Sequence, residues 1–385
     1  MSEVDIRPVR TRRERQIFLN FPWRVYLGDP LWVPPLLPER RKTIDPQQGA
    51  FFKRGVAELF IAWRGEAPVG TICCAEDFAS HLAHPWKDGL FGFFDCRQDY
   101  AIARALFDHA RDWARERGLD ALYGPFNLDY EDSYGVLIEG RSRPAAIYCG
   151  HSPEYYREYF ERYGFQPGRG QNLAFEIEVD LKTPAARRMR RLAEKIRQRG
   201  RFRIRSADLN HWSDEIERVL DLMNRALAHL PGHIPWQREA LEALLEPFRK
   251  IVDPELVLFA ETTQGETVGW LPGIPNLNEV LIHVNGLRYP WNYLQLFWRM
   301  RRPPQSLSLK SVLVPPEYWD TGVAVLLFDE MGQRVAQRGY KWLDLSLTSD
   351  DNPRTPILAE HMGARIYKRY QVYRKWLTNR HVQQD

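Results

Sequence analysis

Two stretches of the chain repeat one pattern of apolar and polar positions, in which a strand is followed by a tight turn and a second strand. The first stretch begins at Glu58 and ends at Gly70, and the second begins at Glu255 and ends at Gly269. The offset between them is 197 residues at the start and 199 at the end. Self-similarity at a long, nearly fixed period predicts a duplicated unit, here one that contains a β-hairpin.

An amphipathic helix is predicted at corresponding places in the two copies, because apolar residues recur at three- and four-residue steps. The first helix is expected at 100–116 and the second at 323–337. Their apolar faces are formed by Ile102, Ala105, Leu106, His109 and Trp113 in the first helix, and by Val323, Leu326, Leu327, Met331 and Val335 in the second. These helices are followed by Gly118 and Gly339, which are 221 residues apart. A later helix in each copy ends at Gly164 and Gly363, where the offset returns to 199.

The changing offset predicts an insertion of about 22 residues in each copy, at different places. The extra segment covers roughly 127–152 in the first copy and lies roughly within 271–305 in the second. We therefore expect two homologous domains, residues 1–180 and 202–385, joined by a linker at 181–201. Nine of residues 182–201 are Lys or Arg, and the linker has helical propensity. It is either a solvated helix or a patch that binds phosphate or a membrane.

Both copies show the same order of elements. Short strands open them at 6–9 and 202–205, and after the hairpin comes another strand, at 92–94 and at 310–314. In the strand after the second amphipathic helix, Leu343, Leu345 and Leu347 alternate with Asp344 and Ser346, as expected for a strand with two different faces. A last helix and closing strands complete each copy. This order predicts a mixed α/β (α+β) class, with mostly antiparallel sheets flanked by helices.

Composition narrows the class of protein. The 385 residues are 44% hydrophobic and 27% charged, which is typical of globular proteins and excludes a disordered or fibrous chain. The net charge of +4 does not favour a nucleic-acid partner. The start of the chain has no apolar signal-peptide core, and no apolar run is long enough to span a membrane. We expect a cytoplasmic protein.

Several common catalytic patterns are not found in the sequence. It has no nucleophile elbow, no phosphate-binding P-loop and no dinucleotide fingerprint. The four cysteines lack zinc spacing, and the closely spaced histidines do not form the His-Glu-x-x-His pattern. We expect no metal.

The order strand–helix–hairpin–strand–helix–strand–helix–strand resembles the Gcn5-related N-acetyltransferase (GNAT) superfamily, and the whole chain resembles a tandem pair of such domains. That family binds acyl-coenzyme A at an Arg/Gln-x-x-Gly-x-Gly/Ala loop that opens the central helix. The second copy has Trp319-Asp-Thr-Gly322-Val323-Ala324, which matches the Gly-x-Ala half but not the leading residue. Helix amides and the helix dipole at such a turn form an anion site. The resemblance implies acetyl-CoA or a longer acyl-CoA as co-substrate.

The resemblance also implies roles for neighbouring residues. Leu313 and Val314, in the strand before the loop, would contact the cofactor. Asn352 stands eleven residues before Gly363, at a position that flanks the pantetheine arm in the family. The Tyr that usually protonates the leaving thiolate is replaced by Ala359.

The first copy departs further from the family pattern. Residues 95–100 contain no glycine, and the position eleven before Gly164 is Pro153. We expect that the first domain lacks the cofactor loop and serves structure or substrate binding.

Acyl transfer to an amine requires a base, a polarised carbonyl and a dry site. Asp344 is the first candidate for the base, because partial burial in mid-strand would make a carboxylate more basic. The alternative is a structurally paired Asp, with the base at Glu279, His283 or an acid of the first domain.

An acidic loop follows a strand of the first copy, within its insertion. It contains Asn127, Asp129, Glu131 and Asp132. Three carboxylates and an amide suit a cationic amine, with Glu131 as a second catalytic candidate and the other three as substrate-binding residues. The alternative is a solvated acidic loop.

Residues 289–298 are uncharged and half of them aromatic, and an Arg cluster follows at 299–302. Trp291 and Trp298 are candidates for substrate binding, at the mouth of an acyl-chain tunnel or in a peripheral membrane contact through 289–302. The alternative is packing between the two domains. The functional interpretation would mean a long, apolar acyl group or acceptor, and some bacterial proteins that resemble this one act on sphingoid bases or similar amines.

Together these patterns favour an N-acyltransferase that moves an acyl group from acyl-CoA to a small or lipid-like amine. Two alternatives remain open. The donor could be an aminoacyl-tRNA, as in some tandem transferases of this fold, and the basic linker fits that donor. The protein could also be an inactive ligand-binding or regulatory protein, because Trp319 and Ala359 replace residues that the family uses.

Overall fold

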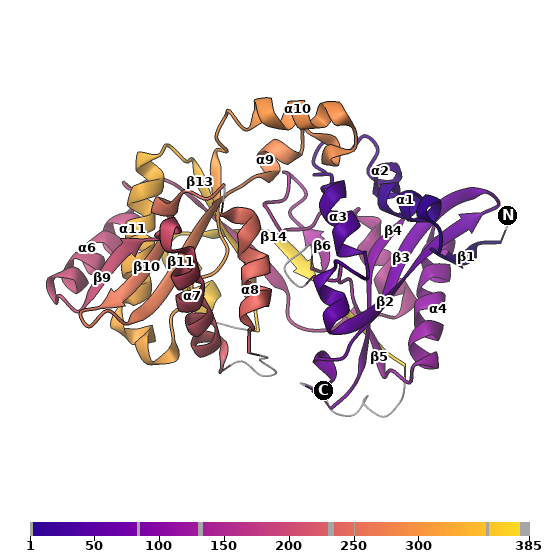
Figure 1. Ribbon diagram of the computed structural model, residues 1–385, viewed down its shortest axis with the longest axis horizontal. Helices are drawn as coiled ribbons and strands as arrows, with labels where there is room; N and C mark the ends of the chain where they lie inside the picture. The colour runs from indigo at the N-terminus through magenta and orange to yellow at the C-terminus, as the bar shows by residue number, and fades with distance from the viewer. Residues whose placement is uncertain are drawn as a thin grey trace.

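The computed structural model describes residues 3–82, 85–129, 134–229, 235–249, 251–351 and 354–377. Figure 1 shows two lobes side by side, each built on one sheet with helices against it, and the helix α10 lying above both. The class expected from the sequence, mixed α/β with two sheets flanked by helices, is confirmed. None of the described helices is both long and apolar enough to cross a bilayer.

The first sheet has the strand order β1-β2-β3-β4-β5-β15-β7. Its described neighbours are antiparallel apart from the parallel pair β4–β5. The strands are β1 (Asp5–Pro8), β2 (Gly55–Arg64), β3 (Ala67–Asp77), β4 (Asp88–Cys96), β5 (Ala121–Gly124), β7 (Gln166–Pro167) and β15 (Tyr373–Trp376).

The second sheet has the order β6-β14-β8-β13-β12-β11-β10-β9. Here the parallel pair is β12–β13, and the other described neighbours are antiparallel. The strands are β6 (Val136–Glu139), β8 (Asn172–Glu178), β9 (Phe202–Ser206), β10 (Val257–Thr262), β11 (Thr267–Pro275), β12 (Ser306–Leu309), β13 (Trp342–Ser349) and β14 (Arg365–Gln371).

The two sheets exchange strands. β15, from the end of the described chain, lies between β5 and β7 in the first sheet, whereas β8 lies between β13 and β14 in the second. Each of these strands therefore pairs on both sides with strands of the sheet built mostly by the other half. The sequence predicts a domain boundary at residues 181–201. The two sheets are not divided there, because β8 precedes this range and lies in the second sheet, whereas β15 follows it and lies in the first.

The helices pack against the faces of these sheets. They are α1 (Arg12–Asn20), α2 (Pro22–Val25), α3 (Leu37–Thr43), α4 (Tyr100–Glu116), α5 (Tyr155–Tyr163), α6 (Pro184–Gln198), α7 (Trp212–Leu227), α8 (Arg238–Leu245), α9 (Asn278–Leu281), α10 (Pro290–Arg299), α11 (Val323–Gln337) and α12 (Arg354–His361). α4 and α11 are the two amphipathic helices predicted from the sequence, with the same bounds. Ile102, Leu106 and Trp113 of α4 are buried in the first core, and Val323, Leu327 and Met331 of α11 in the second.

The strand expected at 310–314 lies earlier in the chain, which corrects the prediction. β12 ends at Leu309, and in the segment beyond it Leu313 makes an isolated bridge to Trp270. From Leu309 to Leu313 the chain advances four residues while its partner strand, from Gly273 to Trp270, advances three. One residue is therefore extra, as in a β-bulge, and the ladder is interrupted.

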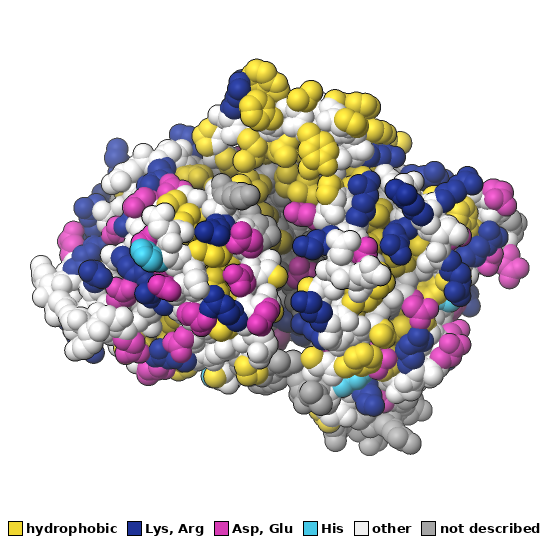
Figure 2. Space-filling model, viewed as in Figure 1, with side chains coloured by type: hydrophobic (Ala, Val, Ile, Leu, Met, Phe, Trp, Pro, Cys, Tyr) yellow, Lys and Arg dark blue, Asp and Glu magenta, His cyan; other side chains and the backbone are white. Residues whose placement is uncertain are grey.

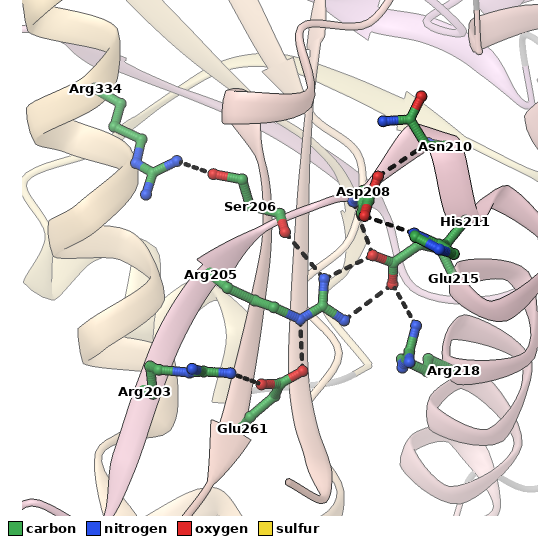
Figure 3. A network of polar contacts seen from close by, with 10 residues as sticks. All are labelled: Arg203, Arg205, Ser206, Asp208, Asn210, His211, Glu215, Arg218, Glu261 and Arg334. Carbon is green, nitrogen blue, oxygen red and sulfur yellow. Dashed lines mark hydrogen bonds and ion pairs between the residues drawn. The ribbon is translucent and has the colours of Figure 1, made fainter.

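A network of ion pairs joins α7 to β9 and β10 (Figure 3). The Arg205 guanidinium donates to Glu215 at 2.6 and 3.0 Å and to Glu261 at 2.5 Å, while Arg203 donates to the other oxygen of Glu261 at 2.8 Å. Glu215 and Glu261 are buried. Since each carboxylate is held by arginines, the network joins α7 to the sheet, and neither Glu215 nor Glu261 is a free base.

The basic linker forms α6, which packs along α11. Ala193 and Ile196 contact Leu326, and Arg197 lies 2.8 Å from Asp329. One face of the basic helix is thus attached to the second lobe.

Candidate active site

The second sheet opens where its two parallel strands separate. β12 and β13 pair from Ser306–Trp342 to Ser308–Asp344. Beyond that point β13 has an irregular register between Asp344 and Leu347, and Ser346 adopts a φ of 59°. The chain after β12 turns toward β11 instead, through the Leu313 bridge. The two strands diverge, and their last pair contains the carboxylate predicted as the base.

Asp344 is completely buried, not partly buried as expected from the sequence. One carboxylate oxygen accepts a hydrogen bond from the Ser308 hydroxyl at 2.9 Å, and the other accepts from the Tyr367 hydroxyl at 2.8 Å. The Lys310 ammonium lies 4.0 Å from the first oxygen. A buried carboxylate needs such partners, because an unpaired charge out of water is strongly unfavourable. We call Asp344, Ser308, Lys310, Tyr367 and Lys368 the Asp344 cluster.

Two lysines connect the Asp344 cluster to a segment of the first half of the chain. Lys310 donates to the carbonyl of Ile147 and, at 3.3 Å, to the Ser346 hydroxyl. Lys368 is completely buried and donates to the carbonyls of Gly140 and Arg143 at 2.6 and 2.8 Å. The segment 140–150 therefore covers the cluster, which lies between parts of the chain that are far apart in sequence.

Burial controls protonation in and around the cluster. It lowers the pKa of Lys368 to about 8, so this lysine loses its proton much closer to neutral pH than an exposed lysine does. It raises the pKa of Tyr367 well above the ordinary value, and the charge of Asp344 raises it further. Tyr367 thus keeps its proton and donates it in the hydrogen bond to Asp344. Burial also raises the pKa of the Cys149 thiol to about 12, so Cys149 is a poor nucleophile.

The corresponding place in the first sheet is filled by the chain itself. β4 and β5 pair from Asp88–Ala121 to Leu90–Tyr123, and the next residues fold back between them. The Phe126 amide donates to the Phe91 carbonyl at 2.7 Å, and the Asn127 side chain accepts from the Phe93 amide at 2.7 Å. Asn127, predicted to bind substrate, therefore has a structural contact.

The N-terminus of α11 has the features of an anion site. Gly322 precedes it with a φ of 89°, a left-handed conformation that glycine adopts without strain, and no side chain caps the helix. The first turn carries no acidic residue. Because the first amides of a helix have no partners within it, those of Val323 and Ala324 suit a pyrophosphate. A Cβ at Gly322 would overlap Ile196, so α6 lies directly against this turn.

Backbone groups expected near the cofactor already have partners. The Leu313 amide and carbonyl bond to Trp270 at 3.0 and 2.9 Å, and the Val314 carbonyl accepts from the Trp319 indole at 2.8 Å. Leu313 and Val314 are buried. Trp319, which replaces the family's Arg or Gln, thus stabilises the loop before α11. Of the groups predicted to bind the cofactor, the backbone groups of Leu313 and the Val314 carbonyl are thus already hydrogen-bonded. The amides at the start of α11 are the predicted groups that fit an anion.

Other predicted residues lie elsewhere or beyond what the structure describes. Glu131, Asp132 and Asn352 lie outside the described residues. Asp129 is engaged in a contact within the chain. Glu279, an alternative base, accepts from the amides of Gln305 and Ser306 at 2.7 and 3.0 Å.

Trp291 and Trp298 lie on α10, and both side chains are more than half exposed. The aromatics of this helix therefore do not pack between the two lobes.

The sequence analysis missed most of the Asp344 cluster. A signal for Ser308 and Lys310 was present, because Ser306, Ser308 and Lys310 alternate with leucines and so face the side of the sheet opposite to Leu307 and Leu309. Tyr367 and Lys368 had no such signal. They belong to β14, which meets β13 through the exchanged strand β8, and Tyr367 lies where the register of β14 shifts.

A cavity of about 530 Å³ lies between α6, α11, the turn after α12 and the strands β8 and β13. Its walls are largely apolar and include Leu181, Met189, Phe328, Met331, Leu343 and Met362. Leu343 precedes Asp344 in β13, so the cavity lies on the opposite face of this strand from the carboxylate. Among the residues that the structure describes, no group of three or more His, Cys, Asp or Glu is placed to hold a metal ion.

This architecture is that of the tandem GNAT proteins, and the chain has the tandem-domain GNAT fold that its order of elements predicts. A tandem GNAT protein from the clavulanic acid biosynthesis pathway superposes with a TM-score of 0.58 over 98% of this chain and 99% of its own, at 12% identity. A GCN5-related glucosamine N-acetyltransferase region of a fungal multi-domain GH3 β-N-acetylglucosaminidase gives 0.57 over 97% of this chain and 38% of its own, also at 12% identity.

Two relatives are similar over nearly the full length of the chain. The bacterial ceramide synthase of Caulobacter vibrioides (strain NA1000 / CB15N) is 28% identical over 385 residues, 98% of both chains. Protein YghO of Escherichia coli (strain K12) is 24% identical over 375 residues, which is 96% of this chain and 95% of its own. No protein-family model matches the sequence.

Proposed function

We propose that this protein is an acyl-CoA-dependent N-acyltransferase whose acceptor is a lipid-like amine. The observation that carries the proposal is the Asp344 cluster, a buried carboxylate with two hydroxyl donors at the point where the parallel strands of a GNAT fold diverge. The relative named a bacterial ceramide synthase supports a lipid-like acceptor, since ceramide is an N-acyl lipid.

The residues of the cluster suit proton removal from an amine. As the amine nitrogen bonds to the thioester carbon and the carbon–sulfur bond breaks, the nitrogen loses a proton. Asp344 is enclosed, so the proton reaches it through a hydroxyl that already donates to it, Tyr367 or Ser308, in exchange for the hydroxyl's own proton. The thiolate of coenzyme A leaves unaided, because a thiol has a pKa of about 8.5. This accounts for the absence of the family's Tyr at Ala359.

The two ends of the donor have separate places. The amides of Val323 and Ala324, together with the dipole of α11, bind its pyrophosphate. The apolar cavity of about 530 Å³ takes the acyl chain, and its volume lies within the range of small-molecule sites. Because this cavity lies on the opposite face of β13 from Asp344, the proposal requires the acyl chain to reach it through the opening where β12 and β13 separate.

The proposal is tested first by calorimetric titration with acetyl-, octanoyl- and palmitoyl-CoA. We expect binding that tightens with chain length, and that weakens in Ala324→Glu but not in the matched neutral variant Ala324→Gln. A carboxylate at this place repels the pyrophosphate, whereas an amide of the same shape does not. If none of the three binds, the acyl-CoA proposal is wrong, and the aminoacyl-tRNA donor or a non-catalytic role takes its place.

Turnover is tested with Asp344→Asn, measured with a long-chain amine as acceptor. We expect kcat to fall by about 10²–10⁴-fold, because the isosteric amide cannot take up a proton, while acyl-CoA binding is unchanged. Tyr367→Phe tests the relay, with a smaller fall expected because the Ser308 hydroxyl remains. Full activity of Asp344→Asn would exclude Asp344 as the base.

A further inference from the structure

The helix α10 exposes apolar side chains around most of its circumference. Trp291, Leu294, Phe297 and Trp298 are 57%, 65%, 59% and 63% exposed, and the buried side chain of this helix is the polar Asn292. Figure 2 shows the result as a broad hydrophobic surface over the top of the molecule, above both lobes. Exposed apolar surfaces of this kind mark sites of contact with another protein or with a membrane.

The charged residues of the chain segment that contains α10 have one sign. From residue 280 to residue 316 the sequence contains no Asp or Glu, while Arg299, Arg301 and Arg302 follow the aromatics directly. The Arg301 guanidinium lies 4.2 Å from the Trp298 ring and 4.8 Å from the Phe297 ring, so cation and aromatics form one surface. Trp and Tyr with neighbouring arginines are typical of segments that lie at the interface of an anionic membrane.

Side-chain hydrogen bonds stabilise the first turn of α10 and the turn before it. The Asn292 side chain accepts from the Tyr289 amide at 2.9 Å and donates to Gln295 at 2.7 Å. The turn before it is attached to the first lobe, because the Trp23 indole donates to Asn285 at 2.5 Å. The start of α10 is therefore fixed by bonds within the helix, and the turn before it by a bond to the first lobe.

We propose that α10 docks this protein onto the surface of an anionic lipid bilayer, with Trp291, Leu294, Phe297 and Trp298 at the depth of the headgroups and the arginines on lipid phosphates. A second copy of the chain fits less well, since a symmetric dimer would place two arginine clusters face to face. The inference goes beyond the proposed function and does not depend on it, because docking needs no acyl-CoA.

The test is co-sedimentation of the full chain with vesicles of phosphatidylcholine alone or with one third phosphatidylglycerol. We expect binding to the anionic vesicles, weakened by salt. Phe297→Ser with Leu294→Ser lowers the partition coefficient by at least about tenfold, since two large apolar side chains are lost. Arg301→Gln and Arg302→Gln each lower it about fivefold, and on the anionic vesicles alone.

Phe78→Ser is the matched control, because Phe78 is 50% exposed but lies at the end of β3, outside the α10 surface. It leaves the partition coefficient unchanged, and thermal unfolding shows that all variants fold alike. Failure of the wild type to bind anionic vesicles overturns the proposal, as does equal binding of the Leu294 and Phe297 variant. Light scattering that shows a dimer, converted to monomer by that variant, would assign the surface to a second copy instead.

Discussion

Lys368 is a charged group in a place where its charge is unfavourable. It is completely buried and bonded to two backbone carbonyls of the first half, so its ammonium has hydrogen-bond acceptors but little solvation. Burial lowers its pKa to about 8, against about 10.4 in an unfolded chain. Between these two pH values the unfolded chain binds more protons than the folded one, so stability must rise with pH there.

We therefore expect Lys368→Met to change how stability depends on pH. In the wild type the burial penalty is fully present below pH 8 and declines toward pH 10, by at most about 1.4 kcal/mol per pH unit. The variant lacks this contribution. Urea unfolding at pH 7.5 and 9.5 should show the wild type gaining more than about 1 kcal/mol relative to the variant. Lys341→Met, which removes an exposed lysine, is the control, and equal slopes in the two variants would contradict the assignment.

Gly332 of α11 offers a way to test the acyl-chain cavity. A Cβ there would meet only Leu181, at 3.9 Å, so a side chain can extend into the cavity without a clash at its base. Gly332→Phe should lower kcat/KM for palmitoyl-CoA by about tenfold or more and leave acetyl-CoA unaffected, since one methylene in an apolar pocket already counts for about tenfold. Gly332→Ala should keep the chain-length preference and stabilise the helix by about 0.5–1 kcal/mol. The same loss for both substrates would place the acyl chain elsewhere.

At the scale of single residues, the sequence predicts which face of a strand or helix a side chain lies on better than it predicts which residues that side chain contacts. Asp344 was proposed from the alternation of its strand, and Gly322 from the resemblance of residues 319–324 to the family's cofactor loop. Tyr367 and Lys368, which lie in the same cluster, could not be predicted from the sequence. They belong to β14, which is separated from β13 by β8, a strand from the first half of the chain, and no local sequence pattern shows this arrangement. The hydrogen bond that Asn127 accepts could not be predicted for a related reason, since its partner Phe93 lies in another strand.

The elements of the fold are set by local patterns and fixed by a few buried polar contacts. α4 and α11 have the bounds that their apolar faces predict, and the hairpins form where expected. β12 was predicted too late in the chain because Val312, Leu313 and Val314 are apolar, although they contact β11 only through a bulged bridge. The α7 contact to its sheet depends on Glu261, whose burial raises its pKa but whose arginine partners lower it by more.

Glu261→Gln should therefore destabilise the protein at pH 7, on the order of 3 kcal/mol, because it removes the buried carboxylate that holds Arg203 and leaves the Arg205 guanidinium with Glu215 as its remaining ion-pair partner. A lowered carboxyl pKa gives stability that is present above about pH 4.5 and lost as pH falls through the folded value. The variant should thus show a flatter loss of stability between pH 5 and 3. Arg203→Gln is the control, since Arg203 is 74% exposed and its removal should cost less than about 1 kcal/mol. Equal effects of the two substitutions would show that burial does not set the strength of this network.

The exchange of β8 and β15 links the two lobes of the molecule through their sheets. β15 carries Tyr373, which is buried in the core of the first lobe although it lies 206 residues beyond Pro167 of β7, its neighbour in the sheet. Sequence alone could not predict the exchange, because a strand's pattern shows which face is buried and not which sheet it joins. A folded state with such links should lose both sheets together.

We expect one cooperative unfolding transition, with the same midpoint for probes in both lobes. Tyr373→Ala should lower the free energy of unfolding by about 3–5 kcal/mol, as for other large aromatic deletions in cores. Amide exchange should then speed up in β10 and β11 as well as in β2 and β3, since opening is shared. Ala101→Ser, at an exposed position at the start of α4, is the control and should leave both sheets unchanged. Faster exchange in the first sheet alone would show that the lobes unfold independently.

The place of β15 in the first sheet also determines when this sheet can be completed during translation. The ribosome finishes β7 at Pro167 and reaches Tyr373 only 206 residues later. At about 5–20 residues per second, this interval lasts roughly 10–40 s. Throughout it, the nascent first sheet has β5 at an open edge, with unpaired backbone groups that β15 will later cover. Until the second lobe has been made, the newly made first lobe therefore exposes a strand edge that is open to pairing with other chains.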